Sequence, residues 1–412
     1  MRKQKSRGLF LQQYKEPAVS GPIEKIGRVK TVYLPISNRL CVNAAEKVTV
    51  GQLVSYGQRP ETVDSFASIF GTAVAVGSFD CEKFIDQQFL QIDALPQSPE
   101  QEALPEDGMP SDEDIQYAAR RCGVINHTDK RTLEELCDDY PNGVRTLVID
   151  AVDDEPYVSS KTVLLFQRGE QIAAAIHAIN RIFCARQIRI DVYDRGEAWT
   201  DRLPQRLEGI SVHRVREPYP VSKRMICDEQ TAYFDVSALL CFYYSALAHR
   251  PYTQTVVTVA GDCVQHSCNI EVPVGTPIGD ILAYCGLKQQ PGVVVLGGSM
   301  TGYAVNTTDI PVLQSTKAIL ALSSHPAFET TECIGCGRCI DVCPEKLLPY
   351  YIYQYTLDNN IEKLYHLSAD RCTECGCCSY ICPAKIDLRQ VVKKSRRALL
   401  KEMWQNESDG QN

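Results

Sequence analysis

The feature that most constrains this chain is a cysteine spacing that occurs twice near its carboxyl end. Residues 333–344 read CIGCGRCIDVCP, and residues 372–383 read CTECGCCSYICP. Both follow the pattern C-x2-C-x2-C-x3-C-P, and 9 of the 19 cysteines lie within residues 333–382. The cysteines at the shared positions are Cys333, Cys336, Cys339, Cys343, Cys372, Cys375, Cys378 and Cys382. Because the basic start of the chain, residues 1–8, is followed by no apolar secretory core, the pattern predicts metal ligation rather than disulfides.

This doubled spacing is typical of bacterial ferredoxins that hold two [4Fe-4S] clusters. Three thiolates, with two residues between each cysteine and the next, wrap one face of a cubane. The fourth, followed by a helix-breaking proline, reaches the neighbouring cluster. The predicted ligand sets are Cys333, Cys336, Cys339 and Cys382 for one cluster, and Cys372, Cys375, Cys378 and Cys343 for the other. Structural zinc is the alternative, but zinc sites normally use paired C-x2-C knuckles. Cys377, the ninth cysteine, is expected to be a packed thiol, although it could compete as a ligand.

Composition limits what else the chain can be. A net charge of -8 over 412 residues gives no reason to expect a nucleic-acid partner. The longest apolar stretch, Val236–Ala248, is too short and too interrupted to cross a bilayer. We therefore expect a cytoplasmic protein, at most peripheral on the cytoplasmic face of a membrane. A basic helix predicted over residues 387–404 is best interpreted as a solvated face, with docking to an acidic partner or a membrane as the alternative.

The pattern along the chain predicts a multidomain α+β protein. Strand-like runs alternate with glycines in residues 28–94, and residues 95–113 hold four prolines and six acids, which indicates a linker. From residue 114, apolar strands alternate with amphipathic helices, and from residue 255 strand signals surround one helix. The predicted units are 1–27 (N-terminal extension), 28–94 (barrel-sandwich hybrid), 95–113 (acidic linker), 114–254 (Rossmann-like α/β domain), 255–325 (β-grasp domain of the SLBB type), 326–404 (α-helical two-cluster ferredoxin-like domain) and 405–412 (tail).

The first β-rich unit resembles the lipoyl-type carrier domains, in which a lysine at a hairpin tip holds biotin or lipoate. No lysine lies between Ser55 and Gly71, the stretch where that hairpin tip is expected. The sequence therefore predicts a structural role for this unit rather than a swinging-arm carrier.

The order of these units resembles the RnfC family, the C subunits of the Rnf electron-transport complex, from about Pro22 to Val392. The segments that carry the resemblance, besides the cysteine runs, are residues 257–262 (VTVAGD), 297–302 (GGSMTG) and 155–157 (EPY). The electron-transfer protein associated with proline reductase is similar too, and the flavin-binding subunit of respiratory complex I is a more distant likeness. The resemblance implies partners that are redox proteins or other subunits of an electron-transfer complex.

In the Rnf family the α/β domain binds FMN and accepts hydride from NADH, so the resemblance implies a flavin region near Gly123, Asp150 and Glu155. The family cradles the FMN phosphate with a loop of the form G-x-G-G-A-G-F-P-T. Here residues 122–130 read CGVINHTDK, and Gly123 is the one glycine that remains. Side chains at the other positions would block the close approach of backbone amides to a phosphate.

Two further flavin segments also depart from the family pattern. The asparagine of N-x-x-E-x-E-P is replaced by Asp150, and the segment Y-P-x-G-G-E-K appears as residues 219–224 (YPVSKR), without its glycines. We therefore expect FMN and NADH binding to be lost or greatly weakened. The alternative is that the phosphate is held by the side chains of Lys130, Lys223 and Arg224.

One smaller constellation remains. Cys263 and Cys268 flank His266 in a C-x4-C pair, which could be a redox dithiol or a fragment of a metal site. With only three donors, two ordinary cysteines are the simpler interpretation. No nucleophile elbow, Walker loop or zinc-protease helix is present in the sequence, so no catalytic residue is predicted.

The sequence thus predicts an iron–sulfur subunit of an Rnf-like or related reductase complex. It would relay electrons between partners through two [4Fe-4S] clusters, without oxidising NADH itself. The alternative is an FMN-containing subunit that oxidises NADH and feeds electrons into the complex. A third hypothesis is a scaffold whose clusters are purely structural.

Overall fold

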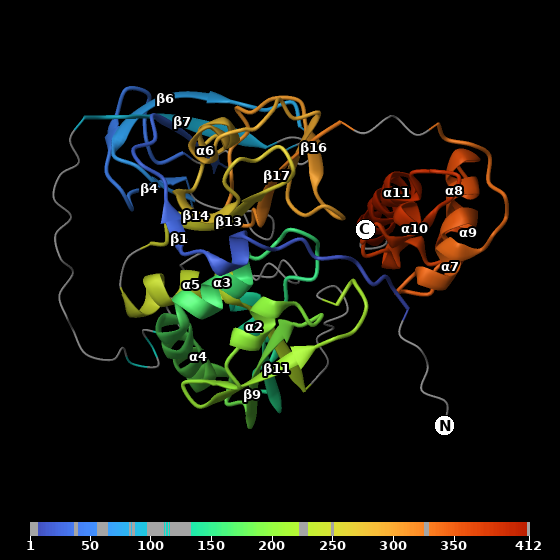
Figure 1. Cartoon of the computed structure of the whole chain (residues 1–412), viewed down its shortest axis with the longest axis horizontal. Coiled ribbons are helices and arrows are strands. Elements are labelled where there is room, and N and C mark those ends of the chain that lie inside the picture. The colour runs from blue at the N-terminus through green and yellow to red at the C-terminus, as the bar shows by residue number, and fades with distance from the viewer. Residues whose placement is uncertain are drawn as a thin grey trace.

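The chain forms a mixed α/β body and a helical unit at its carboxyl end (Figure 1). The computed structural model describes residues 7–36, 40–55, 65–81, 84, 87–96, 111, 113, 115, 133–221, 230–248, 251–324 and 329–409. Within these residues the body contains sheets of six, five, four and two strands. The mixed α/β architecture that the sequence pattern predicts is confirmed.

The five-stranded sheet has the strand order β10-β11-β9-β8-β12. Its strands are β8 (Thr146–Ala151), β9 (Gln187–Tyr193), β10 (Arg206–Leu207), β11 (Ile210–Val215) and β12 (Thr231–Asp235). All neighbours pair in parallel except β10 and β11. Its helices are α2 (Leu133–Asp139), α3 (Ser160–Gln167), α4 (Gly169–Phe183) and α5 (Val236–Phe242), with a 3-10 helix at Ala198–Arg202 and a π-helix at Tyr243–Leu247.

Local sequence explains why these elements form. Along α4 the apolar residues Ile172, Ile176, Ile179 and Phe183 recur every three or four positions, and all four are buried against the sheet core. The helix ends at Cys184, whose backbone is left-handed. At the start of α5, the carboxylate of Asp235 accepts hydrogen bonds from two backbone amides of the first turn, as an N-cap residue does.

The six-stranded sheet has the order β1-β14-β13-β17-β15-β16. Its strands are β1 (Ile23–Lys25), β13 (Gln254–Ala260), β14 (Cys268–Pro273), β15 (Val293–Leu296), β16 (Tyr303–Val305) and β17 (Ala318–Leu322). Helix α6 (Ile278–Cys285) packs on it through Ile278, Ile281 and Leu282. The edge strand β1 comes from residues far from the others in sequence and pairs in parallel with β14. The start of the chain is thereby fixed to this sheet.

The four-stranded sheet has the order β2-β7-β6-β3, and β4 pairs with β5 in a separate two-stranded sheet. The strands are β2 (Thr31–Ile36), β3 (Lys47–Val48), β4 (Leu53–Ser55), β5 (Ser65–Phe66), β6 (Gly71–Gly77) and β7 (Gln88–Ala94). Strand β2 alternates half-buried and buried residues, as a strand with one face in a core does. Its buried residues Val32, Leu34 and Ile36 pack with Val48, Val54 and Ile92.

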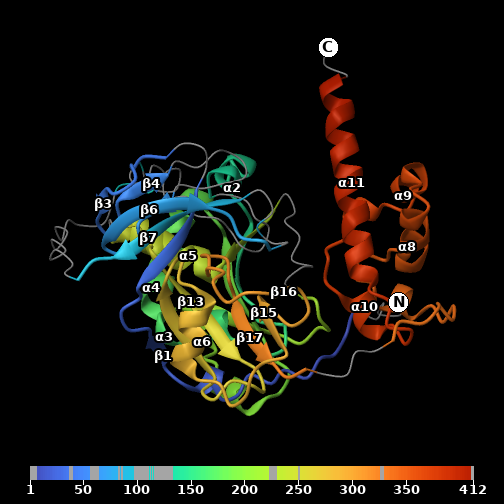
Figure 2. The ribbon, with the colours of Figure 1, turned by 90° about the horizontal axis from the view of Figure 1, so that it is seen from above.

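The carboxyl-terminal unit consists of α7 (Arg338–Val342), α8 (Pro349–Leu357), α9 (Ile361–His366), a 3-10 helix at Ala369–Arg371, α10 (Cys377–Ile381) and α11 (Leu388–Asp409). Figure 2 shows α11 running past α8 and α9 and extending away from the body. Residues 7–17, which precede the 3-10 helix Ala18–Ser20, pass between the body and this unit (Figure 1). In the part of the chain that the structure describes, no helix is long and apolar enough to span a membrane.

Candidate metal centre

The two cysteine runs adopt the same backbone conformation. Helix α7 begins after Gly337, and α10 begins after Gly376; both glycines are left-handed, with φ of 72° and 79°. The two short helices contact each other. In each run the residue after the Cys-Pro-x segment is a left-handed lysine, Lys346 or Lys385. The repeated spacing in sequence therefore becomes a repeated loop and helix in space.

The second run lies against the fourth cysteine of the first run. Burial raises the pKa of the Cys378 thiol, and the nearby Cys375, Cys372 and Cys343 raise it further. Burial also raises the pKa of Cys372 to about 11, with Cys375 and Cys343 adding to the shift. These four cysteines line one small cavity. The structure thus brings together the group that the crossed ligand assignment requires, with Leu347 donating its amide to the Cys343 sulfur at 3.3 Å.

The other group is more exposed. Cys333, Cys339 and Cys382 pack against one apolar patch formed by Ala384, Ile386 and Leu388. Cys336 is exposed, and the neighbouring Ile334 is 71% exposed. Cys378 of the buried group touches the same patch, so the two groups are adjacent.

The donor sets fit two iron–sulfur cubanes. The buried group offers four cysteine sulfurs, and the exposed group offers three that share one patch, with Cys336 between Cys333 and Cys339 in the sequence. Thiolates are the ligands of such clusters. Buried thiols with raised pKa values hold their protons unless a cation compensates the charge of the thiolate, and a cluster supplies that cation. The amides of Gly335 and Glu374 each point at a sulfur, Cys333 and Cys372 respectively, at 3.4 Å. Such hydrogen bonds stabilise sulfur-centred negative charge.

Tyr219 connects the buried cysteine group to the body. Its hydroxyl donates to the backbone oxygen of Cys375 at 2.7 Å, and the side chain is 1% exposed. Burial raises the pKa of Tyr219 well above its ordinary value, so the phenol stays protonated as a donor. Its backbone pairs with Leu9, which belongs to the same buried cluster as Cys375 and Cys377. The cluster unit is therefore attached to the body next to its buried half.

A second attachment runs through the loop of residues 297–302. The carboxylate of Glu155 accepts hydrogen bonds from the amides of Met300 and Thr301 at 2.9 and 3.0 Å. On the other side of the loop, Arg389 of α11 donates to the backbone oxygens of Thr301 at 2.8 Å and Glu374 at 3.1 Å. Glu155, expected near a flavin, is thus a contact that holds this loop.

Asp150, the second residue expected near a flavin, belongs to a buried charge cluster. It lies in β8, and Asp235 ends β12; these parallel strands are neighbours. The ammonium of Lys161 lies 2.7 Å from Asp150 and 2.5 Å from Asp235, and all three side chains are at most 3% exposed. Burial alone lowers the pKa of a lysine, but the two carboxylates outweigh it and raise the pKa of Lys161.

These contacts bear on whether the α/β unit presents groups for a flavin phosphate. The carboxyl ends of parallel strands are where such sheets bind nucleotides. Here the chain's own ammonium and carboxylates already occupy the ends of β8 and β12. The two amides that an anion could use at residues 300–301 are taken by Glu155. At the described ends of β8 and β12, the cation Lys161 is therefore already paired with the two carboxylates rather than presented to a flavin phosphate. Gly123, Lys130, Lys223 and Arg224 lie outside the described residues.

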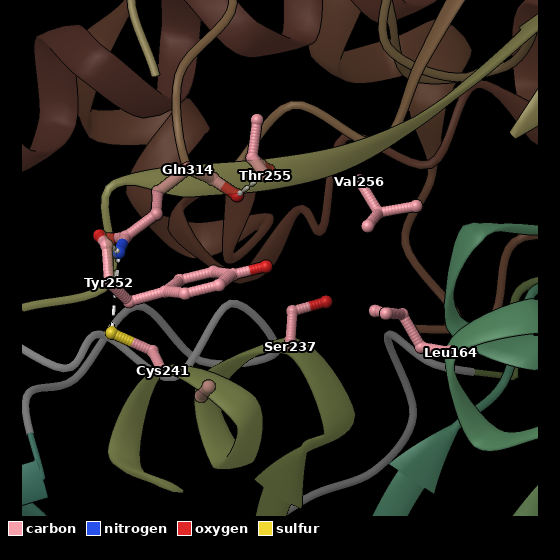
Figure 3. A pocket seen from close by; sticks show the side chains of 8 residues that line it. Leu164, Ser237, Cys241, Tyr252, Thr255, Val256 and Gln314 are labelled. Atoms are coloured by element: carbon pink, nitrogen blue, oxygen red, sulfur yellow. Dashed lines mark hydrogen bonds between the residues drawn. The ribbon is translucent and has the colours of Figure 1, made fainter. Parts of the chain in front are cut away.

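Two cavities elsewhere in the described residues are also unsuited to a nucleotide. Figure 3 shows one between α5 and β13, where Gln314 donates to the Cys241 sulfur at 3.3 Å. Its space of about 10 Å³ admits at most one water molecule. The other is an open groove of about 710 Å³ between α6 and β15, lined by residues without a charged side chain. Neither offers a cation to a phosphate.

Sequence reasoning missed the residues that join the units. Arg389 lies in the helix that the sequence predicts over residues 387–404, but nothing in the sequence indicates its partners in the loop 297–302. Tyr219 lies in a segment expected to face a flavin, and the structure places it against the cysteine unit instead. No local sequence pattern indicates the ion pairs of Lys161, because its two partners are 11 and 74 residues away in sequence.

Comparison with known proteins shows what this chain is similar to. Residues 332–386 match the family of 4Fe-4S dicluster domains. The C subunit of the ion-translocating oxidoreductase complex of Rhodobacter capsulatus is 25% identical over 385 residues, covering 83% of this chain and 73% of the relative. The C subunit of the same kind of complex from Pseudomonas aeruginosa is 25% identical over 397 residues, covering 87% of this chain and 50% of the relative.

A further relative and one solved structure complete the comparison. The C subunit of the Yersinia pseudotuberculosis complex is 27% identical over 245 residues, covering 54% of this chain and 35% of the relative. An NAD+-reducing [NiFe]-hydrogenase shares 14% identity and a TM-score of 0.42 over 64% of this chain and 52% of its own, too weak a likeness to support an argument. The resemblance indicated by the sequence motifs is confirmed: over more than four fifths of its length this chain is a relative of the RnfC subunits of ion-translocating oxidoreductase complexes, with a dicluster iron–sulfur domain at its carboxyl end.

Proposed function

We propose that this chain relays electrons through two [4Fe-4S] clusters as a subunit of an Rnf-type complex. The observation that carries the proposal is the dicluster domain of residues 332–386. In this domain Cys343, Cys372, Cys375 and Cys378 lie together, and Cys333, Cys339 and Cys382 pack on an adjacent apolar patch. In the proposal, Cys372, Cys375, Cys378 and Cys343 hold the buried cluster, and Cys333, Cys336, Cys339 and Cys382 hold the exposed one. The clusters supply the one-electron chemistry, and the protein supplies ligands, burial and sulfur hydrogen bonds.

The difference in exposure gives the relay two distinct ends. The buried set lies beside Tyr219 and Met300 of the body. Ile334 and Tyr380 adjoin Cys333 and Cys382 of the exposed set in sequence, and they are 71% and 59% exposed. Exposed apolar and aromatic side chains suit contact with another redox protein. We place the contact with an electron-transfer partner at the exposed cluster, where these two side chains are accessible.

The division into units is part of the same proposal. The four-stranded sheet would be the core of the barrel-sandwich unit of residues 28–94, and the six-stranded sheet with α6 that of the SLBB-type β-grasp unit of residues 255–325. The α/β unit of residues 114–254 would be a Rossmann-like domain. We further propose that the chain works in the cytoplasm, peripheral to a membrane complex through its partner subunits.

In this proposal the chain does not oxidise NADH itself. The support is the closed charge cluster of Lys161 with Asp150 and Asp235, and the use of Glu155 to hold a loop. The competing function is an FMN-containing subunit that accepts hydride from NADH. No observation on the described residues favours it.

The test of the relay is iron analysis and electron paramagnetic resonance of the full chain purified without oxygen. We expect about eight iron atoms per chain and visible absorption that dithionite bleaches reversibly. Cys336→Ser should disrupt the exposed cluster and Cys375→Ser the buried one, each lowering the iron content toward about four. Cys377→Ser, which changes a buried thiol outside both sets, is the matched control and should keep about eight iron atoms.

Three results would contradict the proposal. An unchanged iron count in both ligand variants would defeat the assignment. Zinc in place of iron would remove the relay. Clusters that dithionite does not reduce would favour a structural scaffold.

A further inference from the structure

A group of metal-binding side chains lies outside the dicluster domain, at the edge of the six-stranded sheet. Donor atoms of Glu24, His266 and Cys268 lie within 4.8 Å of one another. Glu24 is in β1, Cys268 begins β14, and His266 precedes it in the connecting turn. The parallel pairing of Glu24 with Ile270 brings the carboxylate across 242 residues of sequence to the histidine.

A second sulfur, that of Cys285 at the end of α6, lies beside Cys268 but outside the 4.8 Å grouping of the other three donor atoms. The sulfurs of Cys268 and Cys285 lie 3.7 Å apart, and both residues are buried, at 3% and 2% exposure. The amide of His266 donates to the backbone oxygen of Cys285 at 3.1 Å, which fixes the turn against the helix end. Two thiolates bound to one zinc ion at 2.3 Å in tetrahedral geometry are about 3.8 Å apart. The sulfur pair is therefore already spaced for a shared ion, although a hydrogen-bonded thiol pair has a similar spacing.

We propose that Cys268, Cys285, His266 and Glu24 form a zinc site. Two thiolates, an imidazole and a carboxylate make a tetrahedral set that suits zinc, and two thiolates are too few for an iron–sulfur cubane. His266 Nε2 and Glu24 Oε1 now lie 2.5 Å apart, and zinc ligands of this kind are about 3.3 Å apart. The imidazole can move away from the Glu24 carboxylate to this distance, because the His266 side chain is 60% exposed.

The surroundings of the site support the carboxylate as a ligand. The hydroxyl of Tyr284 donates to the second oxygen of Glu24 at 2.9 Å, an outer contact of the kind that orients a metal-bound carboxylate. Cys263, the other cysteine of the C-x4-C pair, instead accepts a hydrogen bond at its sulfur from the side-chain amide of Gln289, at 3.5 Å. The donor set is therefore different from the one that the linear sequence suggests.

The proposed zinc ion would stabilise the fold and would not take part in catalysis. Its four ligands come from three segments: β1, the start of β14 with the turn before it, and the end of α6. With all four positions filled by protein, no position is open for a substrate. The ion would tie the edge strand β1 to the rest of the sheet, so its removal should lower thermal stability while leaving the dicluster domain loaded.

The direct test is metal analysis of the full chain, purified without oxygen from zinc-supplemented cells. We expect about one zinc per chain in addition to the iron. X-ray absorption at the zinc edge, which iron does not obscure, should show two sulfur ligands near about 2.3 Å and two nitrogen or oxygen ligands near about 2.0 Å. A chain with no zinc that also fails to take up added Zn²⁺ would overturn the proposal.

Variants separate this site from adventitious binding. Cys268→Ser and Cys285→Ser should lose zinc at unchanged iron content, whereas Cys263→Ser, a neighbouring buried thiol, should keep it. Because loss of a core thiol can impair folding, His266→Ala supplies a surface test and should weaken zinc affinity at least about tenfold. His366→Ala, an exposed histidine paired with Glu362, is its control. Equal zinc in all variants, or a Cys268–Cys285 disulfide seen by mass spectrometry in the zinc-free chain, would overturn the proposal.

Discussion

Lys161 is a charged side chain that is almost completely buried, at 2% exposure. A buried ammonium is tolerated only where carboxylates compensate its desolvation, as Asp150 and Asp235 do here. The cluster fills the ends of two parallel strands, where a related domain could present groups to a nucleotide. Because the pKa of Lys161 is raised above the ordinary 10.5, the ammonium stays charged below that pH, and its stabilising contribution is lost only at still higher pH.

At the residue scale we predict the effect of Lys161→Met. The substitution leaves two buried carboxylates without their cation, which should lower the free energy of unfolding by about 3–5 kcal/mol. Lys25→Met is the matched control, since Lys25 is 74% exposed and lies 3.7 Å from Glu271. It should change stability by less than about 1 kcal/mol. Denaturant unfolding of both variants measures the difference, and similar values for the two would show that the cluster is not stabilising.

At the scale of elements, the loop of residues 297–302 connects three parts of the molecule. Glu155 of the α/β unit holds its amides, β15 and β16 flank it in the six-stranded sheet, and Arg389 of α11 holds its carbonyl oxygens. Gly298 allows the close approach, because a Cβ atom there would lie 2.1 Å from the Glu155 carboxylate. The glycines of this loop are therefore explained by packing of the protein on itself.

The element-scale prediction is that Gly298→Ala loosens the loop from Glu155. The added methyl group displaces the Glu155 carboxylate, so the hydrogen bonds from two backbone amides are lost. We expect the free energy of unfolding to fall by about 1–3 kcal/mol. Gly77→Ala is the control, because a Cβ there meets nothing within 4 Å. Thermal unfolding and proteolysis near residue 298 report the change. A variant as stable as wild type in both assays would contradict the role given to this contact.

At the scale of the whole molecule, several side-chain contacts attach the cluster unit to the body. Besides Tyr219 and Arg389, the contacts include Lys393, whose ammonium lies 4.6 Å from the ring centre of Tyr303. Tyr219 packs with Cys375 of the buried set, whereas Cys336 and Ile334 of the other run are exposed. This difference in exposure supports the partner contact proposed above at the exposed set.

The whole-molecule prediction concerns flavin. Because the described edge of the α/β sheet is closed by its own charges, we expect well under one FMN per chain after anaerobic purification. NADH should then leave the cluster absorption unchanged, whereas dithionite should bleach it. Flavin fluorescence of the denatured extract and visible spectroscopy measure both. Bound FMN near one per chain with reduction by NADH would show that the competing function is correct.

The sequence by itself determined the features that depend on neighbours along the chain. The doubled cysteine spacing predicts a dicluster domain because the ligands of each loop lie within a few residues of one another. Local alternation and β-branched residues predict strands at residues 32–36, 47–50, 53–56, 72–76 and 89–92. Strands β2, β3, β4, β6 and β7 agree with these ranges to within two or three residues, whereas β5 is not predicted. Apolar residues at near-helical intervals predict a single helix over residues 347–367. The structure instead has α8 and α9 there, separated by the left-handed Asn359.

Only the tertiary structure decided which distant groups meet. Glu24 joins His266 because β1 pairs with β14, and Cys285 joins Cys268 because α6 folds back on the same sheet. Lys161 meets Asp150 and Asp235 because two parallel strands end side by side. Contacts between segments hundreds of residues apart leave no periodic signal in one sequence, because they depend on how sheets and helices pack rather than on local backbone preference.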